Sequence, residues 1–278
     1  MKMKRNEEDE IQVLGTATKK IRGKWVMLLV ACIAIVALSV LLLIDKDVAD
    51  GGDADIARLK KEVMQESSPP TESSAVKVNE DSINDVPLVI YSLVNLKAEL
   101  MLGLPNKEDS TILLAAQAAD IRKDNKGVVG DFILHGEQLS VGKGKAGYCA
   151  IIDGNVSLGI SLEDGVKDYC IEHKGDFFRQ YALVIEGEVQ KNNLKGKAVR
   201  RTLARQGDDL YIIESVNRES LYDFSEALSD IGVTEAIYLV GGEAYMFHRD
   251  SRNGQLYEHG DNSKFPSKNT SYIVFRRK

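Results

Sequence analysis

The stretch Ser215–Phe247, SVNRESLYDFSEALSDIGVTEAIYLVGGEAYMF, decides the expected fold. The run that leads into it, Asp209–Ser215, is apolar, β-branched and too short for a helix, so it predicts a strand. Ser220 can cap the helix that follows, whose apolar residues recur at helical spacing until Gly232 ends it. A second apolar run, Glu235–Val240, predicts the next strand.

A strand, a helix and a strand joined by short loops form a β-α-β unit, whose two strands run parallel through a right-handed crossover. Gly241 and Gly242 follow directly after the second strand. In open sheets of this kind ligands bind beyond the carboxyl ends of the strands, and glycines there let a ligand approach main-chain N–H groups. The glycine pair therefore indicates either a ligand-binding corner or a tight turn without a ligand.

Near the N-terminus, Trp25–Ile44 comprises 20 residues without a charge. As a helix it is about 30 Å long, which matches the hydrocarbon core of a bilayer. The preceding tail, residues 1–24, ends in a basic cluster, whereas aspartates follow the apolar run. The positive-inside rule predicts a single-pass protein of the inner (plasma) membrane, with a cytoplasmic N-terminus and an extracytoplasmic C-terminal part.

Two forms of processing compete with an uncleaved signal-anchor. Leu29–Cys32 has the residue types of a lipoprotein cleavage box, but cleavage there leaves an apolar start to the mature chain. An ordinary cleaved signal has a shorter apolar region. The signal-anchor is favoured, and the polar residues 45–86 after it predict a flexible stalk, in which Ile56–Met64 can form a short helix.

Residues 87–278 are expected to form one domain. Apolar runs flank His135-Gly136 and Asp153-Gly154, as in β-hairpins, and a helix is expected around Glu163–His173. Hairpins combined with one crossover predict an α+β fold with a mixed sheet. Residues 25–278 carry a formal charge of −9, since the tail holds 7 of the 36 Lys+Arg and 4 of the 42 Asp+Glu. This acidic balance argues against nucleic acid as a partner.

The chemistry-bearing residues are few. Cys149 and Cys170 could pair outside the cytoplasm, but the sequence leaves the disulfide open. The four histidines have no metal-ligand spacing, and no cofactor motif occurs, so neither a metal site nor a cofactor is expected. Glu243, directly after the glycine pair, is a candidate acid or base.

Two basic stretches suggest anion or sugar binding. If Lys197–Ala204 is a strand, Arg200 and Arg201 face opposite sides, so only one of them can point to the glycine corner and bind a phosphate. The alternative is a solvated basic strand edge. In Phe177-Phe178-Arg179-Gln180-Tyr181, Arg179 and Gln180 could bind sugar hydroxyls between aromatic rings; alternatively the phenylalanines fill the core and Arg179 is exposed.

Four blocks in order resemble the phosphodiester glycosidase family: GEQLSVGKGKAGYCAIIDGNVSLGI, FFRQYALVIEGEV, AVRRTLARQGDDLYIIES and SLYDFSEALSDIGVTEAIYLVGGEAYM. The resemblance covers about Thr111–Ser271 and lies in the order of the blocks. It implies a hydrolase that removes a sugar from a phosphodiester-linked glycan, here in a divergent, membrane-anchored bacterial branch.

Position by position, the resemblance makes Arg201 the phosphate-facing residue and matches Gly241-Gly242 to the family's Asp-Gly-Gly turn. Val240 stands where the family has the aspartate, and Ala115–Asp120 stands where it has Asn-Gly-Gly. Two hypotheses remain. The chain is an active hydrolase that uses Arg201, the glycine amides and Glu243, or an inactive relative that binds a glycan or a protein at the cell envelope.

Overall fold

The structure, a computed structural model, describes residues 54–64, 72–261 and 268–278. The chain divides into two units, and all described residues belong to the second, residues 50–278. The predicted tail and the predicted span Trp25–Ile44 lie outside the described residues. Within the described ranges, no helix is both long enough and apolar enough to cross a membrane.

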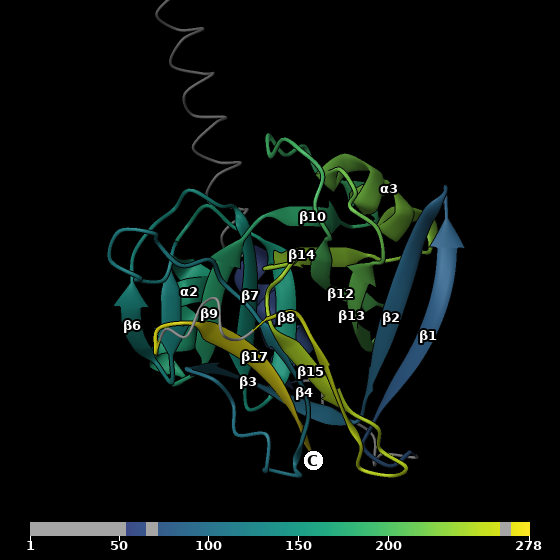
Figure 1. Cartoon of the computed structure of the whole chain (residues 1–278). Coiled ribbons are helices and arrows are strands. Elements are labelled where there is room, and N and C mark those ends of the chain that lie inside the picture. Colours follow the sequence, from purple (N-terminus) through teal and green to yellow (C-terminus); the bar gives the residue numbers. More distant parts are fainter. Residues whose placement is uncertain (1–53, 65–71, 262–267) are drawn as a thin grey trace, which may run out of the picture. The chain divides into compact units, whose positions relative to one another are not determined.

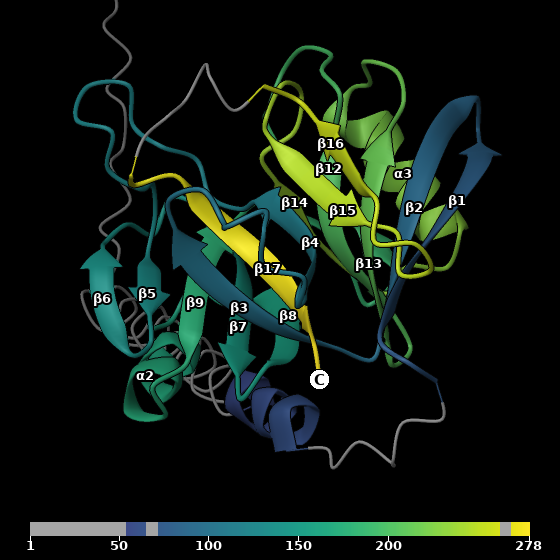
Figure 2. The same cartoon turned by 60° about the horizontal axis from the view of Figure 1, so that its bottom comes forward.

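The described part of the second unit is β-rich and contains three sheets (Figures 1 and 2). The first has seven strands in the order β1 (Ala75–Ile83), β2 (Val86–Val94), β13 (Asp209–Ser215), β12 (Arg201–Gln206), β14 (Glu235–Leu239), β10 (Ala182–Ile185) and β11 (Glu188–Val189). The second has the order β16 (Leu256–His259), β15 (Met246–Arg249), β4 (Ile112–Gln117), β17 (Ser271–Arg277) and β3 (Leu96–Leu102). The third has the order β6 (Glu137–Ser140), β5 (Phe132–Leu134), β9 (Asp176–Gln180), β7 (Gly147–Ile152) and β8 (Asn155–Ile160).

The predicted β-α-β unit exists, but a third strand splits it. β13, helix α3 (Leu221–Asp230) and β14 follow one another, and β12 lies between the two strands, antiparallel to both. β13 and β14 are therefore parallel to each other, as predicted, but not adjacent. Every ladder among the described strands is antiparallel, so the prediction of a mixed sheet is wrong.

The local elements follow the sequence closely. Ser220 Oγ accepts a hydrogen bond of 3.0 Å from the backbone N–H of Asp223, which caps α3. α3 lies against the first sheet (Figure 1). Its apolar side chains pack against that sheet, with Phe224 and Leu228 fully buried. The two predicted hairpins are confirmed, and α2 (Gly165–Glu172) forms within the predicted Glu163–His173. The turn Asp153-Gly154 has positive φ at both residues, which matches the twist of its strands.

Two element boundaries differ from the prediction. The expected strand over Lys197–Ala204 begins only at Arg201. The apolar run Phe178–Ile185, which has the pattern of one strand, is divided between two strands, since β9 belongs to the third sheet and β10 to the first. The chain therefore passes from the third sheet to the first at Tyr181, and no local sequence pattern predicts this change.

The folded unit also begins before Pro87. Residues 54–64 are helical, with Leu59 buried in the cluster that includes α2 and β7, and β1 occupies part of the predicted stalk. β1 is polar because it is an edge strand with most of its side chains exposed. Its composition resembles that of a linker, although it pairs with β2 along its whole length.

Buried polar groups connect the sheets. The Asp176 carboxylate on β9 accepts backbone N–H bonds from Leu100 on β3 at 2.8 Å and from His135 at 2.7 Å. Burial raises the pKa of this carboxyl, while the two N–H donors lower it. Cys149 and Cys170 are buried free thiols, and burial raises the pKa of Cys170 to about 12.

A cluster of rings connects the first and second sheets. The ring of Tyr91 on β2 lies 5.1 Å from that of His248 on β15, and His248 stacks on Tyr257 of β16 at 5.0 Å and 9°. Burial, and secondarily the neighbouring His259, lowers the pKa of His248 to about 4. His248 is therefore neutral in the folded protein at neutral pH.

The lowered pKa of His248 makes the stability of the protein depend on pH. Because His248 binds fewer protons in the folded than in the unfolded chain, the free energy of unfolding falls as the pH decreases from 6.5 towards about 4. The loss is at most about 3 kcal/mol, since one pKa unit corresponds to about 1.4 kcal/mol. Urea unfolding of wild type and His248→Gln between these pH values should show a shallower slope in the variant. Equal slopes would contradict the prediction.

Candidate functional site

The glycine corner, residues 240–244, packs closely against the chain that enters β12. A Cβ added at Gly241 would lie 2.5 Å from the backbone oxygen of Val199, so only glycine fits there. The N–H of Gly242 donates to the same oxygen at 2.8 Å, and Gly242 has a φ of +68°. The predicted role of the Gly242 amide towards a ligand is therefore not met, because this N–H bonds to the protein itself.

Arg201 lies beside the corner, as the family resemblance implies, but its guanidinium is bonded within the protein. Its side chain is 0% exposed. Nη1 donates to the backbone oxygens of Val240 and Ala244, both at 3.1 Å, and Nε donates to the Glu214 carboxylate at 2.5 Å. Arg201 thus connects β12 and β13 to the corner, and the prediction that it faces phosphate is wrong in this geometry.

Arg179 and Gln180 lie on opposite faces of β9. Arg179 is 1% exposed, pairs with the buried Asp131 at 2.7 Å, and donates to the backbone oxygens of Ser161 and Glu163. It can neither bind a sugar, as predicted, nor be the exposed residue of the alternative. Gln180 is also buried, and its side chain donates to Asp120, which lines a cleft beside the corner.

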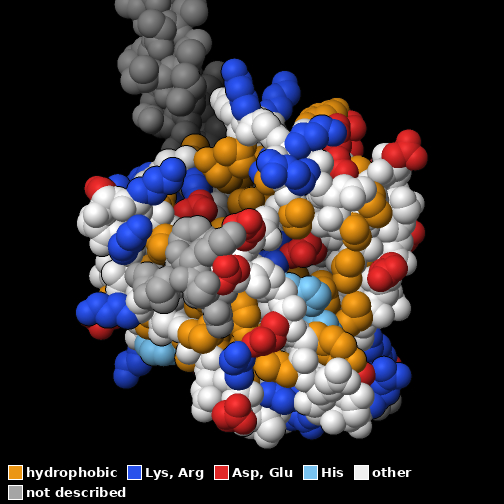
Figure 3. All heavy atoms as spheres, in the orientation of Figure 1, with side chains coloured by type: hydrophobic (Ala, Val, Ile, Leu, Met, Phe, Trp, Pro, Cys, Tyr) orange, Lys and Arg blue, Asp and Glu red, His pale blue; other side chains and the backbone are white. Residues whose placement is uncertain are grey.

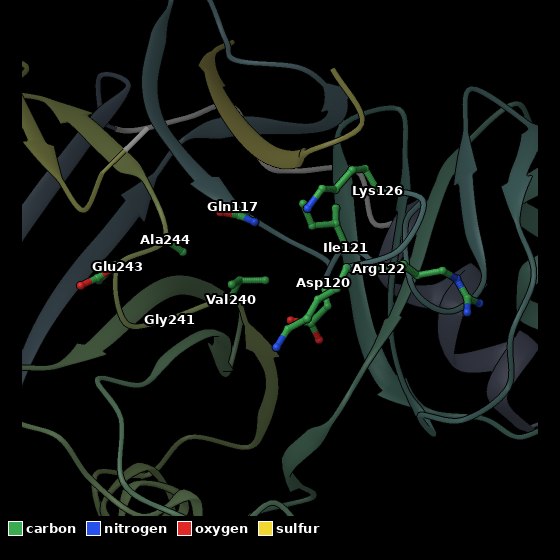
Figure 4. Close-up of a pocket in the computed structure, with 10 residues that line it drawn as sticks. Gln117, Asp120, Ile121, Arg122, Lys126, Val240, Gly241, Glu243 and Ala244 are labelled. Atoms are coloured by element: carbon green, nitrogen blue, oxygen red, sulfur yellow. The ribbon is translucent and has the colours of Figure 1, made fainter. Parts of the chain in front are cut away.

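This cleft, the aspartate cleft, opens between the end of β4 and the glycine corner and has a volume of about 370 Å³ (Figure 4). Its lining is Gln117, Asp120, Ile121, Arg122, Lys123, Lys126, Val240, Gly241, Glu243 and Ala244. Val240 and Ile121 give it an apolar part, and Asp120 and the lysines give it charge. A pocket of this size with a few polar groups suits a small ligand.

Asp120 is held in place by a buried network. Lys145 Nζ donates to Asp120 Oδ2 at 2.5 Å and to Gln180 Oε1 at 2.7 Å, while Gln180 Nε2 donates to the same Asp120 oxygen at 3.2 Å. The Lys145 side chain is nearly buried and lies 4.9 Å from the ring centre of Tyr181. The Asp120 side chain is 40% exposed, so a fixed carboxylate faces the cleft.

The other charged groups of the lining are oriented differently. In Figure 4, Lys126 reaches across the opening, whereas Arg122 turns away from it. The carboxylate of Glu243 points away from Asp120, which does not favour the predicted acid–base role of Glu243 in this cleft. Within the described ranges, no group of three or more His, Cys, Asp or Glu could hold a metal ion.

Neither Asp120 nor Lys145 was predicted as a site residue. Asp120 lies in the loop after the apolar strand β4, and loops carry a large share of functional residues. That signal was present in the sequence. Lys145 gave no such signal, because its partner Asp120 is 25 residues away and on another loop.

No family model matches the sequence, and no curated protein sequence matches it. Among solved structures, the fold is similar to the catalytic domain of zebrafish N-acetylglucosamine-1-phosphodiester alpha-N-acetylglucosaminidase, a domain auto-inhibited by its pro-peptide. The TM-score is 0.52 at 16% identity, over 77% of this chain and 86% of that chain. A hypothetical protein from Synechocystis gives a TM-score of 0.48 at 13% identity, over 76% and 64% of the two chains. The described part of this chain thus has a β-rich α+β fold like that of a phosphodiester glycosidase domain.

The two glycines of the corner should respond differently to substitution. Gly241→Ala forces a Cβ against the Val199 oxygen and should destabilise the protein by roughly 2 kcal/mol or more, because backbone on both sides must shift. Gly242→Ala meets no atom within 4 Å and should cost about 1 kcal/mol for its positive φ. Denaturant unfolding measures both, and the reverse order would contradict the packing of the corner.

Arg201→Ala should act on stability. Removing the guanidinium leaves Glu214 without its partner, and loss of one member of a buried ion pair costs about 3–5 kcal/mol. Lys197→Ala, which removes an exposed lysine just before β12, should change the free energy of unfolding by less than about 0.5 kcal/mol. If the Arg201→Ala variant were as stable as the wild type, the contacts of Arg201 within the protein would not stabilise the fold. Arg201 would then again be a candidate for binding a ligand.

Proposed function

We propose that the chain is a phosphodiester glycosidase-like hydrolase that releases a sugar from a phosphorylated or surface glycan. The reaction adds water across the bond between the sugar's anomeric carbon and a phosphate oxygen, which yields a free sugar and a phosphate monoester. The proposal is supported by the fold and, above all, by the fixed Asp120 carboxylate in the aspartate cleft.

Asp120 is the candidate catalytic residue in this proposal. Its carboxylate accepts a proton from the attacking water, or attacks the anomeric carbon itself, as carboxylates do in glycosidases. Lys145 and Gln180 hold it in one orientation, and a fixed orientation lowers the reorganisation needed in the transition state. Lys145 and Gln180 are thus positioning residues.

A phosphate leaving group suits the rest of the lining. A phosphate monoester leaves as a stable anion, so the reaction depends less on an acid that protonates the leaving oxygen than hydrolysis of an ordinary glycoside does. Lys123 and Lys126 of the lining supply positive charge where that anion develops. Val240 and Ile121 provide an apolar wall for the carbon face of a sugar ring.

The cellular setting is part of the same proposal. The predicted span Trp25–Ile44 would hold the folded unit at the outer face of the plasma membrane, where surface glycans are within reach. The acidic charge of residues 25–278 agrees with a partner other than nucleic acid.

A specific observation favours a second candidate, an inactive relative that binds a glycan or a protein at the cell envelope. Val240 lines the aspartate cleft where the family resemblance implies an aspartate, so one carboxylate of the family's turn is absent. The N–H of Gly242, moreover, is bonded within the protein. The absent carboxylate and the bonded N–H both argue against catalysis, but neither argues against ligand binding.

The Asp120→Asn variant distinguishes the hydrolase from the inactive relative. The full-length chain is assayed for release of reducing sugar from sugar 1-phosphodiesters. If the chain is a hydrolase, Asp120→Asn should lower kcat by at least about 100-fold, because the amide cannot take up the proton or attack. Asp124→Asn, an exposed aspartate on the same loop, should keep wild-type activity. Lys126→Ala should mainly raise KM.

Two outcomes contradict the hydrolase. Unchanged kcat in Asp120→Asn would remove the residue from the chemistry. Binding of sugar phosphodiesters by the wild type without any turnover would identify the inactive relative, and new turnover in Val240→Asp would then explain how the activity was lost.

A further inference from the structure

A second cleft lies between the β1–β2 hairpin and the β15–β16 hairpin. Its volume is about 740 Å³, within the range of about 300–1,000 Å³ that is typical of ligand pockets. We call it the histidine cleft, after His248 and His259, which line it together with Tyr91 and Tyr257. Its lining shares no residue with that of the aspartate cleft. In Figure 3, histidine side chains lie in a hollow beside hydrophobic side chains.

One wall of the histidine cleft is a row of stacked rings. His248 stacks on Tyr257 at 5.0 Å and 9°, and on His259 at 5.6 Å and 17°. The stack follows from the antiparallel register, which places His248 opposite Tyr257, and from the alternation that puts Tyr257 and His259 on one face of β16. Rings stacked in this way cover one another's faces, so their edges, which carry the ring nitrogens and the hydroxyl, remain for a ligand.

His248 carries an unmet hydrogen-bonding capacity in this wall. Its side chain is 8% exposed, and its Nδ1 has no hydrogen-bond partner among the described residues. A buried polar atom without a partner costs roughly 1–3 kcal/mol, so such atoms are rare unless something else occupies the site. Tyr91 Oη lies 3.5 Å from His259 Nε2, which is at the limit of a hydrogen bond. Tyr91 thus has a partner within the protein, and the Nδ1 of His248 is the group that gains from a ligand hydroxyl.

The opposite wall is apolar, and the rim carries little unpaired charge. Val76, Val78 and Val89 of the β1–β2 hairpin line that wall. On the rim, Lys77 pairs with Glu72 at 2.6 Å, and Arg252 pairs with Asp250 at 2.8 Å. Glu80 is a further carboxylate of the lining.

The two walls and the rim indicate which class of ligand the histidine cleft can bind. An anion such as a phosphate is disfavoured, because the cations of the rim are paired and Glu80 repels it. A quaternary ammonium needs open ring faces, which the stack covers. A neutral ligand with many hydroxyl groups and an apolar carbon face matches both walls, since each hydroxyl can donate and accept.

We propose that the histidine cleft binds a neutral saccharide. The ring edges of His248, Tyr257 and His259 bond its hydroxyl groups, and the valine wall covers its carbon face. The site is separate from the hydrolytic centre assigned to Asp120 and does not depend on that assignment. It would allow the protein to hold a glycan chain independently of any reaction.

The test titrates the full-length chain with maltotriose, cellotriose and chitotriose, followed by ligand-observed NMR. At least one should bind with a dissociation constant below about 1 mM. His248→Phe keeps a ring in the stack but removes the nitrogens, and should weaken binding about five- to tenfold. Tyr257→Ala should weaken it at least about tenfold. Tyr222→Ala, which removes an exposed tyrosine outside the cleft, should have no effect.

Asp120→Asn distinguishes this proposal from the proposed hydrolase. It should leave saccharide binding unchanged even if it abolishes turnover. Three results would overturn the proposal: no binding of any of the three saccharides up to about 10 mM, wild-type affinity in a folded His248→Phe variant, or loss of binding in Asp120→Asn. The last of these would place the sugar in the aspartate cleft instead.

Discussion

The buried guanidinium of Arg201 is the interaction on which the functional end of the molecule depends. A fully buried cation is tolerated only when its charge is paired, and here the Glu214 carboxylate supplies the opposite charge. The Nε of Arg201 donates to Glu214, and its Nη1 donates to the backbone oxygens of Val240 and Ala244. These contacts connect β12 and β13 to the corner that forms one wall of the aspartate cleft. The Arg201–Glu214 ion pair also influences the histidine cleft, through the pKa of His259. Burial is the largest cause of the lowered pKa of His259, but Glu214 raises that pKa and Arg201 lowers it.

Much of the fold could be predicted from local pattern. The Ser220 cap, the apolar face of α3 and the two-residue hairpin turns each depend on residues close in sequence, and all of them are found. Which strands pair across long separations could not be predicted in this way. The insertion of β12 between β13 and β14 and the change of sheet at Tyr181 are set by burial of the whole chain. β1 was missed because the outer face of an edge strand has the composition of a linker.

The candidate site was predicted only in part, for a physical reason. Alternation along a strand allowed only one of Arg200 and Arg201 to point to the corner, and the family resemblance indicated Arg201. Alternation cannot tell, however, whether a side chain meets a ligand or a partner within the protein. Arg179 has its partner Asp131 48 residues away, and such a pairing is invisible in local sequence. The glycine pair forms a turn at the predicted place, and the close Val199 backbone oxygen accounts for the glycine at position 241. The carboxylate that does face the aspartate cleft, Asp120, lies in the segment where the family resemblance is weakest.

In the proposed reaction, Asp120 and Lys126 receive the two halves of a sugar phosphodiester in one cleft. A crystal structure of the chain with a non-hydrolysable glycosyl phosphonate tests it most directly. The account predicts the anomeric carbon beside the Asp120 carboxylate and the phosphonate oxygens within hydrogen-bond distance, about 3 Å, of Lys126 Nζ. A phosphonate bound in the histidine cleft, or bound in the aspartate cleft with its sugar turned away from Asp120, would contradict the account.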